Sequence, residues 1–454
     1  MSANSLLLAL LCGTVFVASG LAVAVAVWHR FFARWTGADA VLVCALVWIC
    51  WALALGQMLG AVGLLRRGAL LAMAVATAAA AVAVEIRSPS VSKRKTSAPR
   101  EASAPRKTSA AHVALLGATV LLVGVVAAIW VTRTAITVHR GIDDPDSLGY
   151  HLPFATTFVQ TGYANQHRYL YPDLPVQFYP ANDELLVAMA LALTHSVAFA
   201  AVKNLLYGAL ILVGAYSIGR RYRAGLAALA GGALTLGLPV IAFSQPGEAV
   251  NDALLVLVAV GAVALLANAG RRPAPYVLAA ACLGVAAGVK FSALWPCAAL
   301  GVLAVVLLWR RVETRRGRWV TAMVGAALAL GGSWYLRNAL TYGNPIPPTK
   351  IDLGPVHLRQ IPTPAGPKSY TIFQFLKQGL FLAQFRHGLV LGLGILAAAI
   401  LAVWAVGALS ALATGDDFVR GLGLVAVVCA FGYIDTPASA WGIIGSGHSI
   451  TAFV

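Results

Sequence analysis

Charged residues are scarce in this chain of 454 residues, since they make up 11% of it whereas soluble domains average about 25%. Apolar residues make up 60%, against roughly 45–50% in an average soluble domain. One aqueous core cannot bury so much apolar surface, so the composition excludes a soluble globule, and it excludes intrinsic disorder as well. The expected solvent of this chain is a lipid bilayer.

Cysteine is sparse, and no two cysteines are spaced as Cys-x-x-Cys. All six lie inside apolar runs, at Cys12, Cys44, Cys50, Cys282, Cys297 and Cys429. This pattern indicates neither a disulfide framework nor a zinc site.

Acidic residues are few as well, with 16 Asp and Glu against 33 Lys and Arg, which gives a formal net charge of +17. The basic residues gather at the ends of apolar runs, in 220–223, 271–272 and 310–318, as the positive-inside rule expects of cytoplasmic loops. The turn at 244–252 has no Lys or Arg and is assigned to the outer side, whereas Arg66 and Arg67 fit this scheme poorly. The charge therefore predicts membrane topology, and we expect no nucleic-acid partner.

A membrane-spanning helix needs about 20 apolar residues, because the hydrocarbon core is about 30 Å thick and each helical residue rises about 1.5 Å. About twelve apolar runs qualify, near residues 5–28, 39–63, 68–86, 112–131, 197–219, 224–243, 249–269, 275–289, 291–309, 319–337, 388–412 and 418–434. The predicted fold is an all-α, polytopic integral membrane helical bundle, located in the cytoplasmic (inner) membrane.

The chain divides into four predicted segments. Residues 1–86 form three membrane helices, and residues 87–111 form a basic, Pro/Ser-rich cytoplasmic linker that either contacts anionic lipid or is a solvated connection. Residues 112–437 form the membrane core, and residues 438–454 form a short tail after which the chain stops abruptly, as a truncated chain or a short variant would.

Two long polar segments are assigned to the outer side of the core, at 132–196 and 338–387. Ordinary connections are about 4–6 residues long, so loops of this length are expected to carry the functional site and short amphipathic helices.

Three carboxylates stand close together in the first outer loop, at Asp143, Asp144 and Asp146. Carboxylates crowded at a low-dielectric boundary raise one another's pKa, and one of them could then take a proton from a bound hydroxyl. The alternative is structural, with Pro145 making a turn and the aspartates capping a short helix that starts at Ser147.

The longer string DSLGYHLPFATTFVQTGY, followed by YPDLPVQFYPANDELL, resembles the first outer loop of polytopic glycosyltransferases of the GT-C class, nearest to family-39-like (mannosyltransferase-like) bacterial enzymes. The matching positions are Asp146, Tyr150, His151, Pro153, Gly162, Tyr179, Pro180, Glu184 and Leu185. Looser similarities follow in NDALL (251–255), GVKFSAL (288–294) and WYLRNALTYGNPIPP (334–348). The three leading helices and the linker are extra relative to the simplest family layout, and Gly149 stands where Thr is commoner.

The resemblance implies a sugar donor linked to polyprenyl phosphate, and transfer with inversion to an acceptor outside the cytoplasmic membrane. Such a reaction needs a base for the acceptor hydroxyl and positive charge for the departing phosphate. Asp146 is the first candidate base, followed by Asp144 and Asp143. Lys290 and Arg337 are candidates for the phosphate, although either could instead extend to lipid headgroups.

Three further residues are candidate substrate-binding groups. Tyr150 and His151 begin a predicted helix beside Asp146, where His151 could orient a carboxylate or the acceptor or could have a structural role. Glu184 could bind the acceptor or a metal, or could simply favour a helix N-terminus. A divalent ion could bridge carboxylates and phosphate, but no spacing requires one.

Other functions stay open from the sequence alone. A transporter or flippase of a lipid-linked glycan would have polar or broken helices near the bilayer midplane, and a non-catalytic membrane assembly subunit is a further alternative. The sequence identifies neither the sugar nor the acceptor, which could be an extracytoplasmic glycan, lipid or protein.

Overall fold

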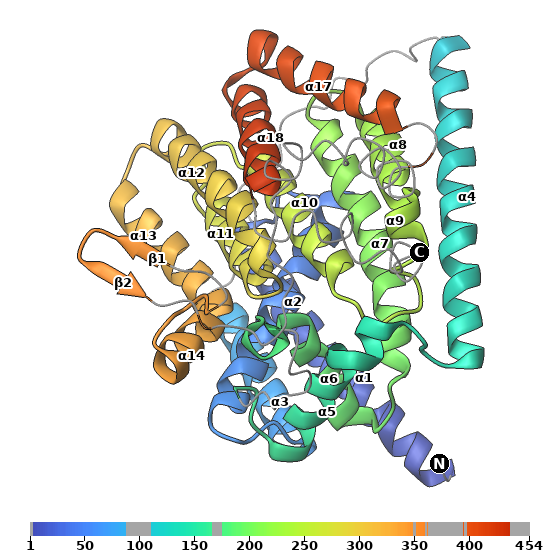
Figure 1. The fold of residues 1–454 in the computed structure, drawn as a ribbon, viewed down its shortest axis with the longest axis vertical. Helices are drawn as coiled ribbons and strands as arrows, with labels where there is room; N and C mark the ends of the chain where they lie inside the picture. The colour runs from blue at the N-terminus through green and yellow to red at the C-terminus, as the bar shows by residue number, and fades with distance from the viewer. Residues whose placement is uncertain are drawn as a thin grey trace.

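A computed structural model describes residues 3–87, 110–165, 175–347, 351–358, 361, 394 and 397–435 (Figure 1). Within these ranges the fold is a helical bundle, and the strands there are two, β1 (Ile351–Leu353) and β2 (Val356–Leu358), which pair antiparallel as one hairpin. The α-helices are α1 (Ala3–Phe31), α2 (Ala38–Ala61), α3 (Arg67–Arg87), α4 (Ala110–Arg140), α5 (Leu152–Thr161), α6 (Asn182–Thr194), α7 (Ala198–Arg220), α8 (Gly225–Leu236), α9 (Pro239–Ala242), α10 (Asp252–Asn268), α11 (Ala274–Ala287), α12 (Leu294–Arg311), α13 (Arg316–Ala327), α14 (Ser333–Tyr342), α17 (Ala397–Thr414) and α18 (Asp417–Asp435). The predicted all-α architecture is confirmed.

Seven helical stretches in the described ranges are long and apolar enough to cross a membrane by length and composition. They are α1, α2, α3, α4, α7, the stretch Phe291–Arg311 that contains α12, and the stretch Arg316–Tyr342 that contains α13 and α14. Helices α8, α10, α11 and the described part of α17 are apolar but shorter. These lengths support the prediction of a multi-pass membrane protein.

Three of the predicted spans have different limits in the structure. The run at 112–131 continues as α4 to Arg140, so the first outer loop begins nine residues later than expected. The run at 224–243 is divided into α8 and α9, because Leu238 is extended and Pro239 has no N–H for a helical hydrogen bond. The run at 319–337 continues through a π-helical segment, η5 (Leu328–Gly332), to Tyr342.

The predicted linker and tail lie largely outside the described residues. Helix α3 reaches Arg87 and α4 begins at Ala110, so residues 88–109 between them are outside the description. The tail at 438–454 and most of the second outer loop are also outside it.

One end of the bundle collects the basic loops, and we call it the basic end. Four ion pairs lie there, Arg220–Asp39 (3.1 Å), Arg221–Asp416 (3.5 Å), Arg310–Asp417 (3.0 Å) and Arg271–Glu313 (3.1 Å). They connect the end of α7 to the start of α2 and to the loop between α17 and α18, the end of α12 to the start of α18, and the loop after α10 to the loop after α12. The basic segments that the sequence assigned to one side therefore do meet at one end.

The opposite end, which we call the acidic end, holds the segment from α4 to α6, the 243–251 loop and the connection between α11 and α12. The connection between α2 and α3 reaches the same end, where the backbone N–H of Leu65 donates to the carbonyl of Gly162 (3.1 Å). Arg66 and Arg67 follow directly, which explains why they fit the positive-inside pattern poorly.

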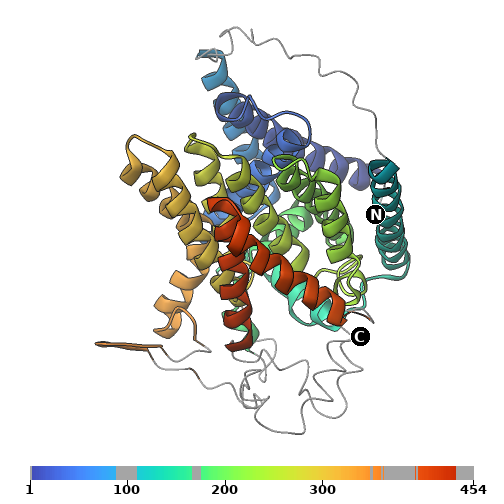
Figure 2. The same ribbon diagram turned by 90° about the horizontal axis from the view of Figure 1, so that it is seen from above.

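Helix α4 stands at the flank of the bundle in both ribbon views, beside α7 and α8 (Figures 1 and 2). The three N-terminal helices pack against one another and against α6, and α2 also packs against α7. Gln57 of α2 donates from Nε2 to Asn182 Oδ1 (2.9 Å) and to the carbonyl of Leu330 (3.0 Å). The leading helices are thus in direct contact with the predicted core.

Candidate functional site

The acidic segment after α4 begins a helix at Pro145, and Asp144 caps it. The backbone N–H of Ser147 donates to Asp144 Oδ2 at 2.7 Å, as in an N-cap. The next turn, η2 (Ser147–His151), is π-helical and leads directly into α5. π-Helical turns are frequent at functional sites, because the extra residue redirects the side chains of the turn. Because Asp144 accepts the N–H of Ser147, it caps this helix, which is the structural alternative that the sequence left open for the aspartates.

Asp146 lies in the first turn of this helix and is half-buried. Tyr150 donates from its hydroxyl to Asp146 Oδ2 at 3.3 Å. Burial raises the pKa of Asp146, and the charge of Asp144 raises it further, while His151, Lys290 and the Tyr150 hydrogen bond act in the opposite direction. Asp143 is exposed. The burial of Asp146 thus favours its protonated form.

His151 and Glu184 form a buried pair next to Asp146. His151 Nδ1 lies 2.5 Å from Glu184 Oε1, and both side chains are nearly inaccessible. Asn251 donates from Nδ2 to the same Glu184 oxygen at 3.1 Å. Glu184 lies in the first turn of α6, as predicted, and its position there also suits the helix dipole. Within the described residues, Glu184 Oε2 and Asn251 Oδ1 are buried acceptors without a hydrogen-bond donor.

Lys290 forms an ion pair with another acid of this end, Asp252. It lies in extended backbone between α11 and α12, and its ammonium group pairs with the carboxylate of Asp252 at the start of α10. Gln245 donates from Nε2 to the other oxygen of that carboxylate at 3.2 Å. Because the charge of Lys290 lowers the pKa of Asp146, the two groups lie within electrostatic reach of each other.

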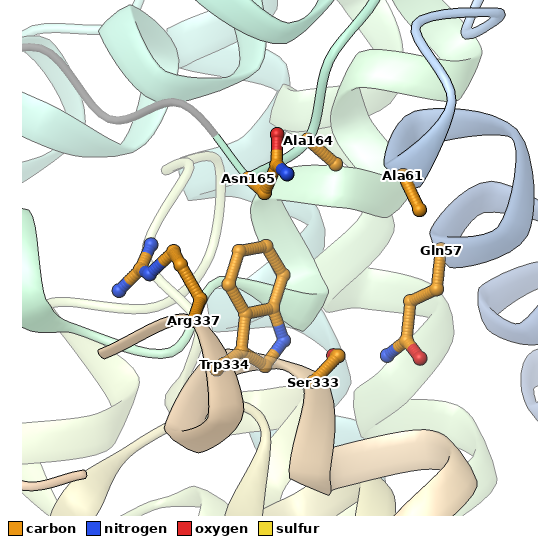
Figure 3. Close-up of a pocket in the computed structure, with 7 residues that line it drawn as sticks. All are labelled: Gln57, Ala61, Ala164, Asn165, Ser333, Trp334 and Arg337. Carbon is orange, nitrogen blue, oxygen red and sulfur yellow. The ribbon is translucent and has the colours of Figure 1, made fainter. Parts of the chain in front are cut away.

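Arg337, the second predicted phosphate ligand, faces a different cavity. Its guanidinium lies over the Trp334 ring, 5.3 Å from the ring centroid, and donates to the carbonyls of Gln177 (3.3 Å) and Tyr179 (3.4 Å). Figure 3 shows Trp334 at the centre of this cavity, with Arg337 and Gln57 on opposite sides of it. The cavity has a volume of about 50 Å³ and is lined by Gln57, Ala61, Ala164, Asn165, Ser333, Trp334 and Arg337.

Tyr179 contacts residues of both regions, since its carbonyl accepts from Arg337 and its ring packs beside Tyr150. Its ring makes edge-to-face contacts with Tyr150 (6.1 Å between centroids) and with Phe291 (5.9 Å), which follows Lys290. Burial, together with the charge of Asp146, raises the pKa of Tyr179 to about 12. Tyr179 therefore stays a neutral phenol that forms one wall of the Asp146 site.

Sequence reasoning missed several groups of the site. Glu248 Oε2 accepts the backbone N–H of Asp144 at 3.3 Å, and burial raises its pKa. Lys203, fully buried in α7, pairs with Asp183 at 2.7 Å. A lysine inside an apolar run was the available signal, because a charge in a membrane segment is costly unless it is paired or functional.

A metal site finds no direct support in the described parts of the chain, where no group of three His, Cys, Asp or Glu side chains is arranged to hold an ion. Whether the protein uses such an ion stays an open prediction.

In comparisons with known proteins, the chain matches no family model, no curated protein and no solved structure. The resemblance to GT-C enzymes therefore stays a prediction from the sequence motifs.

Proposed function

We propose that this chain is a multi-pass membrane glycosyltransferase of the GT-C type, which transfers a sugar from a polyprenyl-phosphate donor to an acceptor at the acidic end. One observation carries the proposal. Asp146 is a half-buried carboxylate with a raised pKa that lies within electrostatic reach of Lys290, while three neighbouring acids each have a basic partner of their own. A base and a phosphate-binding cation near one another are what inverting glycosyl transfer requires.

In the proposed reaction, Asp146 takes the proton of the acceptor hydroxyl as its oxygen bonds to the anomeric carbon of the sugar. The bond from that carbon to the phosphate oxygen breaks at the same time, and the polyprenyl phosphate leaves with the electron pair. Lys290 stabilises the negative charge of the departing phosphate. His151, held by Glu184, orients the acceptor, and Tyr150 holds Asp146 through its hydroxyl.

The proposed donor also suits the surroundings of the site. An isoprenoid tail stays in the bilayer, so the donor has to reach the site from the side of a helical bundle. Helix α4 at the flank exposes large apolar side chains such as Leu121 (70%) and Val120 (63%). By the positive-inside rule, the basic end faces the cytoplasm and the acidic end faces the outside of the inner membrane.

The test is transfer of radiolabelled sugar from synthetic polyprenyl-phosphate donors by the purified protein in proteoliposomes. Asp146→Asn should lower kcat by about 10²–10⁴-fold, the contribution typical of a general base. Lys290→Gln should lower it by about 10²–10³-fold, as for loss of one charge-stabilising donor. The matched control is Asp417→Asn at the basic end, which should leave transfer unchanged. Undiminished transfer by Asp146→Asn would overturn the proposal.

A transporter or flippase of a lipid-linked glycan is the second candidate, because the bundle contains interrupted helices. The apolar run that holds α8 and α9 is broken at Leu238, and η5 interrupts the stretch Arg316–Tyr342. Interrupted helices are typical of transporter sites. Movement of a labelled glycolipid across proteoliposomes without any new glycosidic bond would favour this candidate, and activity of neither kind would favour an assembly subunit.

A further inference from the structure

Two pairs of adjacent residues at the acidic end share one pattern, a basic residue followed by asparagine. They are Lys203 and Asn204 on α7, and Arg337 and Asn338 on α14. In both pairs the two side chains donate hydrogen bonds to backbone carbonyls of a neighbouring non-α-helical segment. We call them the α7 pair and the α14 pair.

The α7 pair binds the 243–251 loop. Asn204 Nδ2 donates to the carbonyls of Gln245 (2.9 Å), Glu248 (3.1 Å) and Val250 (3.1 Å). Lys203 Nζ donates to the carbonyl of Val250 at 2.7 Å and is held by Asp183. Both side chains of the pair are fully buried. This loop carries Glu248 and continues into Asn251 and Asp252, which contact Glu184 and Lys290.

The α14 pair binds the short turn η3 (Pro175–Phe178) and the residue after it. Arg337 donates to the carbonyls of Gln177 and Tyr179, and Asn338 Nδ2 donates to the carbonyl between them, that of Phe178, at 2.9 Å. Asn338 Oδ1 in turn accepts from Arg337 Nη2 at 2.8 Å. Three consecutive carbonyls are therefore bound by one pair, and the third belongs to Tyr179, the wall of the Asp146 site.

One of these carbonyls, that of Gln245, also accepts a hydrogen bond from within its own segment, from the backbone N–H of Glu248 at 3.3 Å. The other carbonyls accept hydrogen bonds from the two helical pairs. The 243–251 loop has no regular secondary structure, and η3 is a single 3-10 turn. A buried carbonyl without a donor costs about 1–3 kcal/mol, so donors supplied by a rigid helix select one conformation of each segment.

We infer that both pairs are positioning residues of the proposed active site. The α7 pair fixes the loop that presents Asp252 and Asn251, and the α14 pair fixes Tyr179 against Tyr150. The inference rests on the proposed function, and it gives Arg337 a role through the backbone of η3 in place of a phosphate contact. Displacement of a reacting group by about 1 Å can cost about 10²-fold in rate, so small loop shifts should be measurable.

The kinetic test uses Asn204→Leu, Asn338→Leu and Arg337→Lys in the sugar-transfer assay. Each should lower kcat about tenfold to a hundredfold with little change in the KM for the donor. Arg337→Lys is decisive, because lysine keeps the charge but loses the planar guanidinium, whose Nε and Nη2 hold Asn338 Oδ1 while Nη2 also donates to the carbonyls of Gln177 and Tyr179. A normal kcat in Arg337→Lys, or a defect confined to the KM for the donor, would overturn positioning and favour a direct phosphate contact.

A labelling test reports loop position without any activity. Val176 in η3 and Ala249 in the loop are 1% and 2% exposed, so cysteines placed there, in a chain with the native cysteines replaced, should be protected from a membrane-impermeant maleimide. Asn338→Leu should raise the labelling of Val176→Cys but not of Ala249→Cys, and Asn204→Leu should raise the labelling of Ala249→Cys but not of Val176→Cys. Each increase should be at least about tenfold, because each variant loses about one hydrogen bond to a carbonyl that keeps its segment closed.

The two tests separate the possible failures. If the wild-type protein transfers no sugar, the proposed function fails, while labelling still decides whether each pair holds its own segment. Unchanged labelling overturns the inference, and so does equal exposure of both positions in one variant, because that indicates general unfolding. Raised labelling combined with a normal kcat also overturns the inference, because it shows that each pair holds its segment without positioning the active site.

Discussion

Replacing Lys203 by methionine removes one partner of a buried ion pair and keeps the length of the side chain. Lys203 Nζ lies 2.7 Å from Asp183 Oδ2, and both side chains are fully inaccessible. Removing one partner of such a pair leaves an uncompensated buried charge and typically costs about 3–5 kcal/mol. We therefore expect Lys203→Met to lower the free energy of unfolding by about that amount.

The sign of the pH dependence follows from the same pair. Burial raises the pKa of Asp183, and the charge of Lys203 acts against that rise, so removing Lys203 raises the pKa further. The cost is then present at pH values above that pKa and is relieved as the pH falls and Asp183 takes up a proton. Lys203→Met should be less destabilising at pH 5 than at pH 8.

Unfolding in mixed micelles of increasing SDS fraction, followed by circular dichroism, measures this change. Arg310→Gln is the control, because its pair with Asp417 is exposed (61% and 56%) and such pairs contribute about 0–1 kcal/mol. The double variant Lys203→Met/Asp183→Leu should recover most of the loss, since apolar pairs often replace buried ion pairs without penalty. The reasoning is refuted if Lys203→Met costs no more than Arg310→Gln, or if the double variant is less stable than the single one.

Three further predictions concern the site and the packing. The rate of sugar transfer should fall as the pH is lowered, and it should fall at a higher pH than a solvent-exposed aspartate base would give, because the raised pKa of Asp146 leaves this base protonated there. A pH–rate profile of sugar transfer checks this. Asp144→Ala should cost about 1 kcal/mol in the same unfolding assay, as for loss of an N-cap, and Asp144→Asn should retain most of that stability. Gly331→Ala should destabilise the bundle by about 1–3 kcal/mol, because its new Cβ would lie 2.2 Å from the carbonyl oxygen of Gly284, whereas Gly117→Ala meets nothing within 4 Å and should be neutral or stabilising.

The helices were predictable because a bilayer imposes a length and a composition on each span. Each of the twelve predicted runs overlaps at least one helix within the described residues. The errors lie where the hydropathy of a segment does not predict whether its backbone is helical. Helix α4 continues through polar residues to Arg140, since Thr, Arg and His lower the hydropathy of a segment without breaking its helix. At Pro239, by contrast, the helix is broken although the run around it is apolar throughout, so the hydropathy of the run did not predict the break.

The local part of the site was predictable, whereas its long-range contacts were not. Asp144, Asp146 and His151 lie within one turn or two of each other, so their proximity follows from the chain itself. The pairs of Lys290 with Asp252 and of Lys203 with Asp183 depend on how α6, α7, α10 and α11 pack. A single sequence gives no measure of that packing, because apolar surfaces of helices fit one another in many registers.

Charge pairing, more than the number of carboxylates, decides which acid of this site can serve as a base. Three acids of the cluster have a basic partner each, in the pairs Asp183–Lys203, Glu184–His151 and Asp252–Lys290. Asp144 accepts the backbone N–H of the helix that it caps. Asp146 has no ion pair within the described chain and accepts a hydrogen bond from the Tyr150 hydroxyl alone. No basic side chain is therefore bound to its carboxylate, and burial raises its pKa, which favours the uptake of a proton by a general base.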